Sequence, residues 1–422
     1  MALLWQHAEI MFLIKRLNPL AAVVDQAWLS LLNFSISMAF IWYATKAEYG
    51  YYILLLAPLL LVQSLQNAIV NSPLATFLPS AEDTEKNRTK ATAVSLHIYL
   101  GLVCGVLGFM GLWGYGLVTR AHIDILLLSG FTLAIAGTIA REAQRSFAYV
   151  QGQGLRALAG DLLYGLVLLI GIAMALADSS LSAGIVLLMT GVAGLAPLII
   201  KISKFNGLQT HAEPLRKFWS CSRWALPSVM VTWVNLSSYP FFAGKALGLS
   251  AVADIGAARL FLMPIGLMMA AWANWYRPKI SGWLAEGNMQ AITSVTNRSL
   301  QIGLAGMTML AAFFIFAYPW IETFLGGQYQ GLQALILMWL FFFSISLVIN
   351  IYMATLMTDE AGYKALHHIT WLALALSLPG FVLFSHNGAL WVIGVLCVVE
   401  LLQAVLVINK ARKYLKRLGA QA

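Results

Sequence analysis

Charged side chains are scarce in this sequence. They account for 10% of its 422 residues, whereas hydrophobic residues account for 60%. A soluble domain carries about a quarter charged residues. A chain this apolar has too little polar surface to cover itself in water, which excludes a soluble globular protein and predicts a membrane protein.

Motifs of enzymes and metal sites are also lacking. The three cysteines, Cys104, Cys221 and Cys397, are far apart and form no C-x-x-C pair, so neither a disulfide framework nor a zinc site is indicated. The seven histidines are scattered. There is no G-x-x-x-x-G-K-[ST] loop and no H-E-x-x-H motif. We therefore expect no cofactor, no metal and no enzymatic activity.

What the sequence has in abundance is long apolar runs. A helix needs about 20 apolar residues to cross the hydrocarbon core of a bilayer. Twelve segments approach this length, and they predict an all-α membrane protein of about 12 transmembrane helices. The segments are Pro19–Ala44, Tyr52–Thr76, Val94–Val118, Ile123–Ile139, Ala157–Leu176, Leu181–Ile200, Trp224–Leu247, Ala251–Tyr276, Leu300–Trp320, Leu332–Met357, Leu366–Phe384 and Ala389–Ile408.

The basic residues predict the orientation of these helices. Of the 26 Lys and Arg residues, only Lys46, Arg120 and Lys245 fall in loops on one side, and nearly all the others fall on the opposite side. By the positive-inside rule, both termini are cytoplasmic. Because the basic residues form short clusters between apolar runs, rather than a stripe or a tail, we expect no nucleic-acid partner.

A faint internal repeat divides the chain. Glu48, Gly50 and Pro58 recur as Asp254, Gly256 and Pro264, each displaced by 206 positions. The repeat predicts two six-helix lobes of the same topology. They comprise an N-terminal lobe at 1–200, a cytoplasmic linker at 201–218 and a C-terminal lobe with a basic tail at 219–422.

Charged residues inside the membrane are costly unless they face protein or water, so they are candidate functional residues. Arg259 lies within a predicted helix, where its planar guanidinium suits a phosphate; a salt bridge or a position at the outer interface is the alternative. Asp25 and Glu400 are candidates for ion coupling, although a helix-entry role and a helix-pairing role are equally open.

Amide side chains form a second group of candidates for a substrate cavity, because they hydrogen-bond sugar hydroxyls without carrying charge. Single buried amides more commonly join helices. Four of them follow one stripe of the second predicted helix, and the others stand singly. The candidates are Asn33, Gln63, Gln66, Asn67, Asn71, Asn235 and Asn274.

Arg141, Arg145 and Arg223 lie at predicted cytoplasmic helix ends, where they could attract an anionic headgroup or simply anchor the helices. In the third predicted helix, Gly105 and its neighbours at 101 and 108 predict close helix packing.

Several short segments, spread over nearly the whole chain, together resemble one family. They are VDQAWLSLLNF (24–34), which leads to EYGYY (48–52), and then FLGGQY (324–329), NIYMATLM (350–357) and NGALWVIG (387–394). In this order they resemble polysaccharide exporters and O-antigen (Wzx-like) flippases of the multidrug/oligosaccharidyl-lipid/polysaccharide (MOP) superfamily. The arginine-rich cavity of better-known Wzx-type flippases is thinner here, since Arg259 is the one clear mid-helix cation, and this leaves the charge of the substrate open.

The resemblance implies two lobes that alternate between inward-open and outward-open states in a bacterial inner membrane. Its usual cargo is an undecaprenyl-pyrophosphate-linked oligosaccharide, flipped with a proton or sodium gradient. Membrane lipids, a polysaccharide polymerase and glycosyltransferases are the implied partners. Two alternatives stay open: a MATE-like small-molecule antiporter, and a membrane glycosyltransferase or polysaccharide polymerase.

Overall fold

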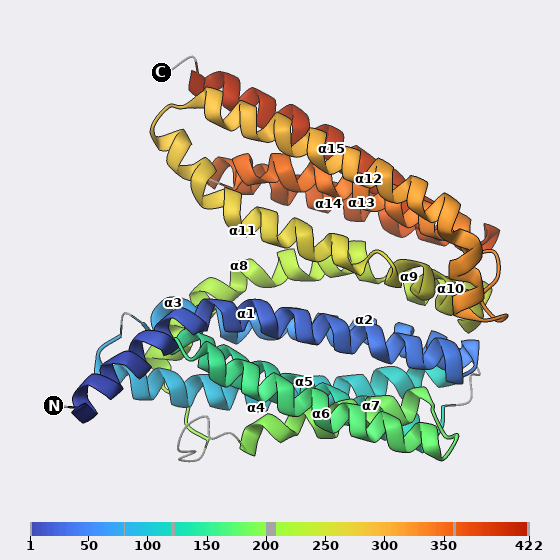
Figure 1. Ribbon diagram of the computed structural model, residues 1–422, viewed down its shortest axis with the longest axis horizontal. Helices are drawn as coiled ribbons and strands as arrows, with labels where there is room; N and C mark the ends of the chain where they lie inside the picture. Colours follow the sequence, from blue (N-terminus) through green and yellow to red (C-terminus); the bar gives the residue numbers. More distant parts are fainter. Residues whose placement is uncertain (1, 80, 120–122, 200–207, 358–359, 420–422) are drawn as a thin grey trace. The chain divides into compact units, whose positions relative to one another are not determined.

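The computed structural model describes residues 2–79, 81–119, 123–199, 208–357 and 360–419, and these residues form helices joined by short connections (Figure 1). The chain divides into two compact units, Met1–Met230 (unit 1) and Val231–Ala422 (unit 2). The boundary falls within one long helix. Part of the predicted linker at 201–218 lies outside the described residues.

Unit 1 contains eight α-helices, the last shared with unit 2, and two short irregular helical segments. They are α1 (Ala2–Tyr43), α2 (Lys46–Gln66), the π-helix η1 (Asn67–Asn71), α3 (Ser72–Phe77), α4 (Asp83–Thr119), α5 (Ile125–Val150), α6 (Gly154–Ala177), α7 (Ala183–Leu195), the 3₁₀ turn η2 (Ala196–Ile199) and the first part of α8 (Ala212–Ser237).

Unit 2 contains the end of α8 and seven further α-helices. They are α9 (Tyr239–Leu247), α10 (Leu249–Leu260), α11 (Met263–Ala285), α12 (Met289–Leu325), α13 (Gln333–Leu356), α14 (Glu360–Phe384) and α15 (Ala389–Gly419), with a 3₁₀ turn η3 (Ser385–Asn387) between the last two. Helix α13 packs against both α12 and α15.

The all-α membrane architecture is confirmed. Among the described residues, nine helices are long and apolar enough to cross a membrane, and a tenth span forms if α10 and α11, bent by 51° at their junction, are taken together. The two remaining predicted spans are helical but atypical. One is the short pair α7 and η2, and the other is α8 with α9, interrupted near Ser238. The cytoplasmic position of the termini stays a prediction.

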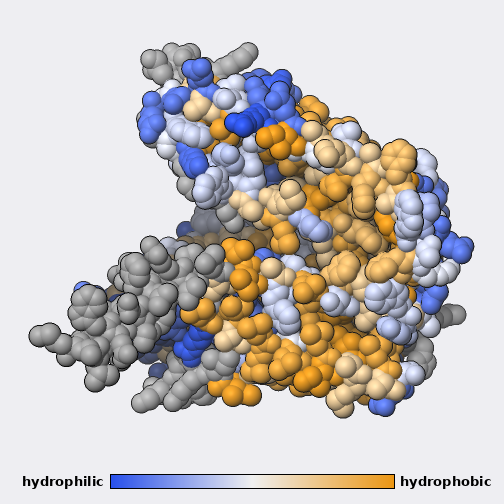
Figure 2. All heavy atoms as spheres, viewed as in Figure 1, coloured by the Kyte–Doolittle hydropathy of each residue, from blue (hydrophilic) through white to orange (hydrophobic). Residues whose placement is uncertain are grey.

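The surface of each unit matches a lipid environment. Large apolar side chains are exposed along mid-helix positions, including Leu102 and Met110 in α4 and Phe316 in α12. Figure 2 shows hydrophobic residues across the middle of the helices and hydrophilic residues gathered towards their ends. Apolar surface on this scale would be unstable in water, so the bilayer is its solvent.

Helix α5 is longer than expected. The sequence predicted that the apolar span ends at Ile139, because Arg141 and Arg145 read as cytoplasmic charges, but the helix continues to Val150. The charges stay inside the fold because carboxylates of neighbouring helices meet them, as described below. This correction moves Arg141 and Arg145 from a helix end into the body of unit 1.

Close packing of α5 against α7 depends on paired glycines. A methyl group on Gly137 would lie 2.3 Å from the backbone oxygen of Gly191, and one on Gly130 would lie 2.4 Å from the backbone oxygen of Gly184. Gly194 faces Gly137 in the same way. Small residues at such a seam let two backbones approach, which is a main source of helix association in membranes.

We predict that Gly137→Ala destabilises unit 1 by about 1–3 kcal/mol, because the new methyl group forces the two backbones apart. The measurement is thermal unfolding of the detergent-purified chain. Gly111→Ala is the matched control, since a methyl group there meets nothing within 4 Å. Equal stability of the two variants would contradict the packing role of the seam.

Candidate functional site

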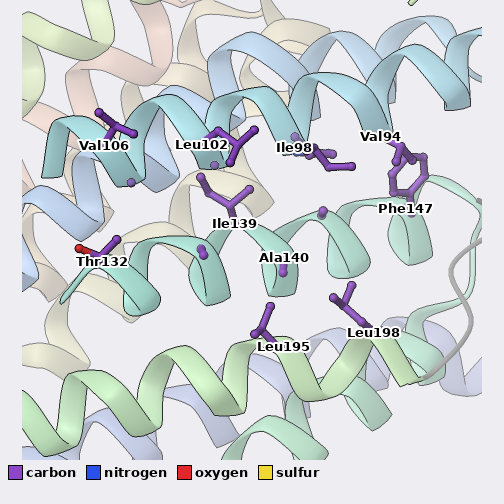
Figure 3. Close-up of a pocket in the computed structure, with 15 residues that line it drawn as sticks. Val94, Ile98, Leu102, Val106, Thr132, Ile139, Ala140, Phe147, Leu195 and Leu198 are labelled. Carbon is purple, nitrogen blue, oxygen red and sulfur yellow. The ribbon is translucent and has the colours of Figure 1, made fainter. Parts of the chain in front are cut away.

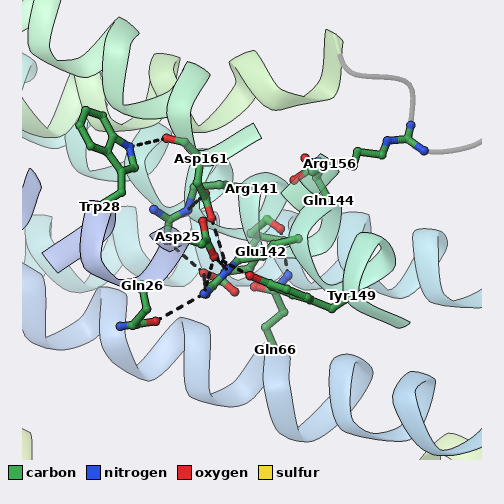
Figure 4. Close-up of polar contacts among 12 residues, drawn as sticks. Asp25, Gln26, Trp28, Gln66, Arg141, Glu142, Gln144, Tyr149, Arg156 and Asp161 are labelled. Carbon is green, nitrogen blue, oxygen red and sulfur yellow. Dashed lines mark hydrogen bonds and ion pairs between the residues drawn. The ribbon is translucent and has the colours of Figure 1, made fainter. Parts of the chain in front are cut away.

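Five charged side chains meet inside unit 1. Asp25 comes from α1, Arg141, Glu142 and Arg145 from α5, and Asp161 from α6. Arg141 and Arg145 are four residues apart, so the helical period places them on one face of α5. We call these five residues the charge cluster, and Figure 4 labels four of them, Asp25, Arg141, Glu142 and Asp161, which point toward one another from the three helices.

Arg145 lies at the centre of the charge cluster. Its Nη2 lies 3.0 Å and its Nε 3.1 Å from Oδ2 of Asp25, and its Nε also lies 3.3 Å from Oδ2 of Asp161. The hydroxyl of Tyr149, one turn further along α5, donates to the same Asp25 oxygen at 2.7 Å. One guanidinium therefore joins α1, α5 and α6.

Arg141, one turn before Arg145 in α5, pairs with Glu142 and Asp161. Its Nη2 donates to Oε1 of Glu142 at 3.0 Å, and its Nε lies 3.8 Å from Oδ1 of Asp161. The guanidinium also lies over the ring of Tyr164, 4.5 Å from the centroid. Nearby, Trp28 Nε1 donates to the backbone oxygen of Asp161 at 2.9 Å, which fixes α1 against α6.

The charges of the cluster do not balance. Three carboxylates face two guanidiniums, and the side chains of Asp25 and Asp161 are fully buried. Within the described residues, Oδ1 of Asp25 and both carboxylate oxygens of Asp161 accept no hydrogen bond, although Asp161 lies within ion-pair distance of both arginines. A buried excess of one negative charge is costly. The arrangement is therefore suited to hold one proton or one cation.

A polar pocket of ≈ 220 Å³ lies beside the charge cluster, enclosed by α1, α2, α5, α6 and α7. Asn33 and Gln63 line it together with Arg141 and Arg145, so four of the candidates from the sequence meet in one place. Thr138 and Thr190 add hydroxyl groups, and leucine and isoleucine side chains complete the walls. Asp25 adjoins this site through Arg145.

The remaining amides of the second predicted span do not share this pocket. Gln66 is fully buried and turns toward α4 and α5, where its Nε2 lies 2.9 Å from the backbone oxygen of Ile139. Asn67 is exposed and accepts from Ser72, and Asn71 is half-buried. A π-helix at 67–71 shifts the register here, and such segments are frequent at functional sites.

Arg259, in α10 of unit 2, has a different environment. Its Nη1 donates to the hydroxyl of Tyr239 at 3.2 Å, and its guanidinium lies 5.2 Å from the ring centroid of Trp339. In the described part of unit 2, no carboxylate lies within ion-pair distance of it. Arg259 is thus half-buried among aromatic rings with its positive charge uncompensated.

The other candidates are dispersed. Asn235 joins α8 to α14, because it donates to the backbone oxygen of Thr370 at 3.2 Å and accepts from Ser377 at 2.8 Å. Glu400 is buried in α15 and accepts from Ser346 of α13 at 2.5 Å.

Two further candidates, Arg223 and Asn274, are not placed in the charge cluster or in the polar pocket. Arg223 is exposed in α8, where its guanidinium lies 5.4 Å from the ring centroid of Trp224. The side chain of Asn274 lies outside the described residues.

The sequence did not single out Asp161, Glu142 or Tyr149. Asp161 carried a usable signal, because it is an acid five residues into the predicted span that begins at Ala157. Such a residue is a functional candidate by the same rule that selected Arg259. Glu142 and Tyr149 carried no such signal, since they followed the predicted end of their helix.

The fold is that of transporters of the MOP superfamily. The lipid II flippase MurJ in an inward-closed conformation superposes with a TM-score of 0.74 at 12% identity, covering 96% of this chain and 90% of that one. An inward-facing multidrug resistance MATE family transporter gives 0.74 at 14% identity, covering 93% and 96%. A MOP superfamily transporter from Pyrococcus furiosus gives 0.66 at 14%, covering 96% of both chains. No protein-family model and no curated protein sequence matches the chain.

The charge cluster makes a prediction about stability. Arg145→Met removes the partner shared by Asp25 and Asp161, and breaking a buried pair costs about 3–5 kcal/mol. Adding Asp25→Asn restores part of the loss, because the neutral amide no longer needs that cation. Thermal unfolding in detergent measures both, and the exposed Arg216→Met serves as the control. Strictly additive effects of the two substitutions would show that the pair does not interact.

Proposed function

We propose that this chain is a flippase that moves an oligosaccharide linked to undecaprenyl pyrophosphate across the inner membrane of a bacterium. The product would serve surface polysaccharide biosynthesis, together with glycosyltransferases and a polymerase. Two observations support this: a fold shared with a lipid II flippase and with MATE transporters, and charged side chains buried in each unit.

The observation that carries the choice of cargo is the environment of Arg259. Arg141 and Arg145 are paired with the carboxylates of the charge cluster, whereas Arg259 meets only Tyr239 and Trp339 among the described residues. An uncompensated guanidinium attracts an anion, and its fork of donors suits a phosphate. This favours a phosphorylated glycolipid over a cationic amphiphile.

The charge cluster of unit 1 supports ion coupling. We infer that its excess of one carboxylate is compensated by one proton, which is held by Asp25 or Asp161, the two buried carboxylates beside Arg145. Either a proton or a sodium ion would supply the missing positive charge. Glu400, buried in unit 2, is a second candidate for proton binding.

Alternating access is the mechanism proposed for the cycle. The structures with this fold include inward-closed, inward-facing and outward-facing conformations, so the fold supports more than one state. A proton that enters the charge cluster weakens the ion pairs between α1, α5 and α6. The energy of the gradient thereby biases unit 1 toward one of two helix arrangements.

The alternative within the same fold is a small-molecule antiporter. MATE transporters are as similar in fold as the lipid II flippase, and the charge cluster is acidic overall. Its carboxylates, however, are paired with arginines, so they offer a cationic drug little free charge. Drug-resistance profiling of cells that express the chain separates the two functions.

Sugar transfer by the purified chain would instead indicate a glycosyltransferase or a polymerase.

Arg259→Gln tests the cargo. We expect flipping of a fluorescent undecaprenyl-pyrophosphate oligosaccharide in proteoliposomes to slow about tenfold or more, because a charge-assisted hydrogen bond to phosphate is lost. Lectin accessibility of the sugar measures the rate. Lys245→Gln, an exposed cation in α9 of the same unit, is the control. An unchanged rate in Arg259→Gln would reject the phosphate role of this residue.

Asp25→Asn tests the coupling. The amide cannot take up a proton, so flipping should lose its response to an imposed pH gradient while passive exchange persists. The same assay with and without a gradient measures this. Tyr149→Phe is the control, because it removes a hydrogen bond to Asp25 but leaves the Asp25 carboxylate in place. Flipping by this variant should still respond to the gradient. A full gradient response in Asp25→Asn would place the coupling group elsewhere.

A further inference from the structure

Unit 1 carries an apolar groove separate from the charge cluster. It has a volume of ≈ 740 Å³ and is formed by α4, α5 and the end of α7 with η2. Figure 3 shows Val94, Phe147 and Leu198 at one end and Val106 and Thr132 at the other. Its walls are almost entirely aliphatic, so water would be unstable in it. A hydrocarbon chain is the occupant that such walls accept within a bilayer.

Two glycines of α4 open the groove. Gly101 and Gly105 line it, and methyl groups on them would meet only Ile139 and Thr132, at 3.9 and 3.8 Å. These glycines therefore do not bring two helices into tight contact as the sequence suggested. Gly108, in contrast, does: a methyl group there would lie 2.3 Å from the side chain of Ile135. The first two glycines leave space that α4 would otherwise fill.

One end of the groove holds a buried polar atom. His97 lines it with 4% of its surface exposed, and its Nδ1 lies 3.1 Å from Nε2 of Gln66. The other hydrogen of that amide points to the backbone oxygen of Ile139 at 2.9 Å, which fixes the amide orientation because two oxygens would repel. Gln66 thus donates to Nδ1, and His97 must carry its proton on Nε2.

The Nε2–H of His97 is therefore a donor, and it meets no acceptor among the described residues. A buried donor without an acceptor is costly, so a ligand of this groove would be stabilised by an oxygen that accepts this hydrogen. The acceptor must sit at one end of a hydrocarbon chain. An acyl ester carbonyl has this chemistry.

The position of His97 along α4 fits the same ligand. Lys90 is the last charged residue of α4 before a stretch without charge, and Val94 lies one turn beyond it. Carbonyls of lipid esters lie at this boundary between polar and hydrocarbon layers. From Val94 to Val106 the helix rises about 18 Å, close to the roughly 15 Å of one leaflet of the hydrocarbon core.

We propose that this groove binds one acyl chain of a membrane glycerophospholipid, whose ester carbonyl accepts a hydrogen bond from Nε2–H of His97. The lipid would be a resident component of unit 1. It packs along α4 and α5, and α5 carries the arginines of the charge cluster. The inference does not depend on what cargo the chain carries.

The test is native mass spectrometry of the full chain in detergent, titrated with dioleoyl phosphatidylglycerol or with its ether-linked analogue, which lacks the ester carbonyls. We expect the wild-type chain to bind the ester lipid about fivefold more tightly than the ether lipid, the effect of one hydrogen bond. His97→Phe should bind both lipids equally. Gly105→Phe, which fills the groove, should lose this binding site.

Gly111→Phe is the matched control, because this glycine lies in the same helix and faces open space. It should bind as the wild type does. Leu198→Trp narrows the groove from η2 and repeats the test if Gly105→Phe does not fold, as judged by circular dichroism. Equal lipid binding by the wild type and a folded groove-filling variant would overturn the proposal. So would equal affinity of the wild type for ester and ether lipids, or displacement of the phospholipid by equimolar undecaprenyl phosphate.

Discussion

The ion pair of Arg145 with Asp25 and Asp161 is the interaction on which the rest of unit 1 depends. It is made by one guanidinium and two fully buried carboxylates from three different helices. Charges are costly in a bilayer unless they are paired, so α1, α5 and α6 cannot separate without exposing one of them. The apolar surfaces of these helices would pack almost equally well against lipid. The charge cluster therefore specifies which helices are neighbours.

In the proposed function, the same interaction would let unit 1 respond to an ion gradient. A cluster with balanced charges would only hold the three helices together, whereas a cluster with an excess carboxylate can gain or lose a proton. Arg259 in unit 2 is the counterpart, a cation among aromatic rings without a carboxylate partner in the described chain. Unit 1 thus carries an excess of negative charge, and unit 2 carries an arginine without a carboxylate partner among the described residues. We propose that the charge cluster holds a proton and that Arg259 binds an anionic headgroup.

Much of this could be predicted from the sequence, because hydropathy alone determines membrane helices. All twelve apolar runs are helical within the described residues, and Asp25 and Arg145 were each selected as intramembrane or interfacial charges. Their partnership was not predictable, since it joins residues about 120 positions apart through tertiary packing. The length of α5 was underestimated for the same reason. Its internal charges look like a cytoplasmic helix end unless the carboxylates of α1 and α6 are known to meet them.

The π-helix at 67–71 and the groove beside His97 show a second limit. A π turn leaves no clear mark on the sequence, and it separates amides that a regular helix would align. The glycines of α4 carried a packing signal, but only the structure distinguishes Gly108, which contacts α5, from Gly105, which leaves a space. The spacing of small residues in the sequence shows where a second helix could approach. Only the position of the neighbouring helix shows whether the space beside each glycine is occupied.

The protonation of the charge cluster can be measured most directly by infrared difference spectroscopy of the reconstituted chain. At neutral pH the wild type should show the band of a protonated carboxyl group, shifted in heavy water and lost in either Asp25→Asn or Asp161→Asn. A wild-type spectrum in which all carboxylates are ionised at neutral pH would contradict a proton held by Asp25 or Asp161, and with it the proposed coupling through Arg145.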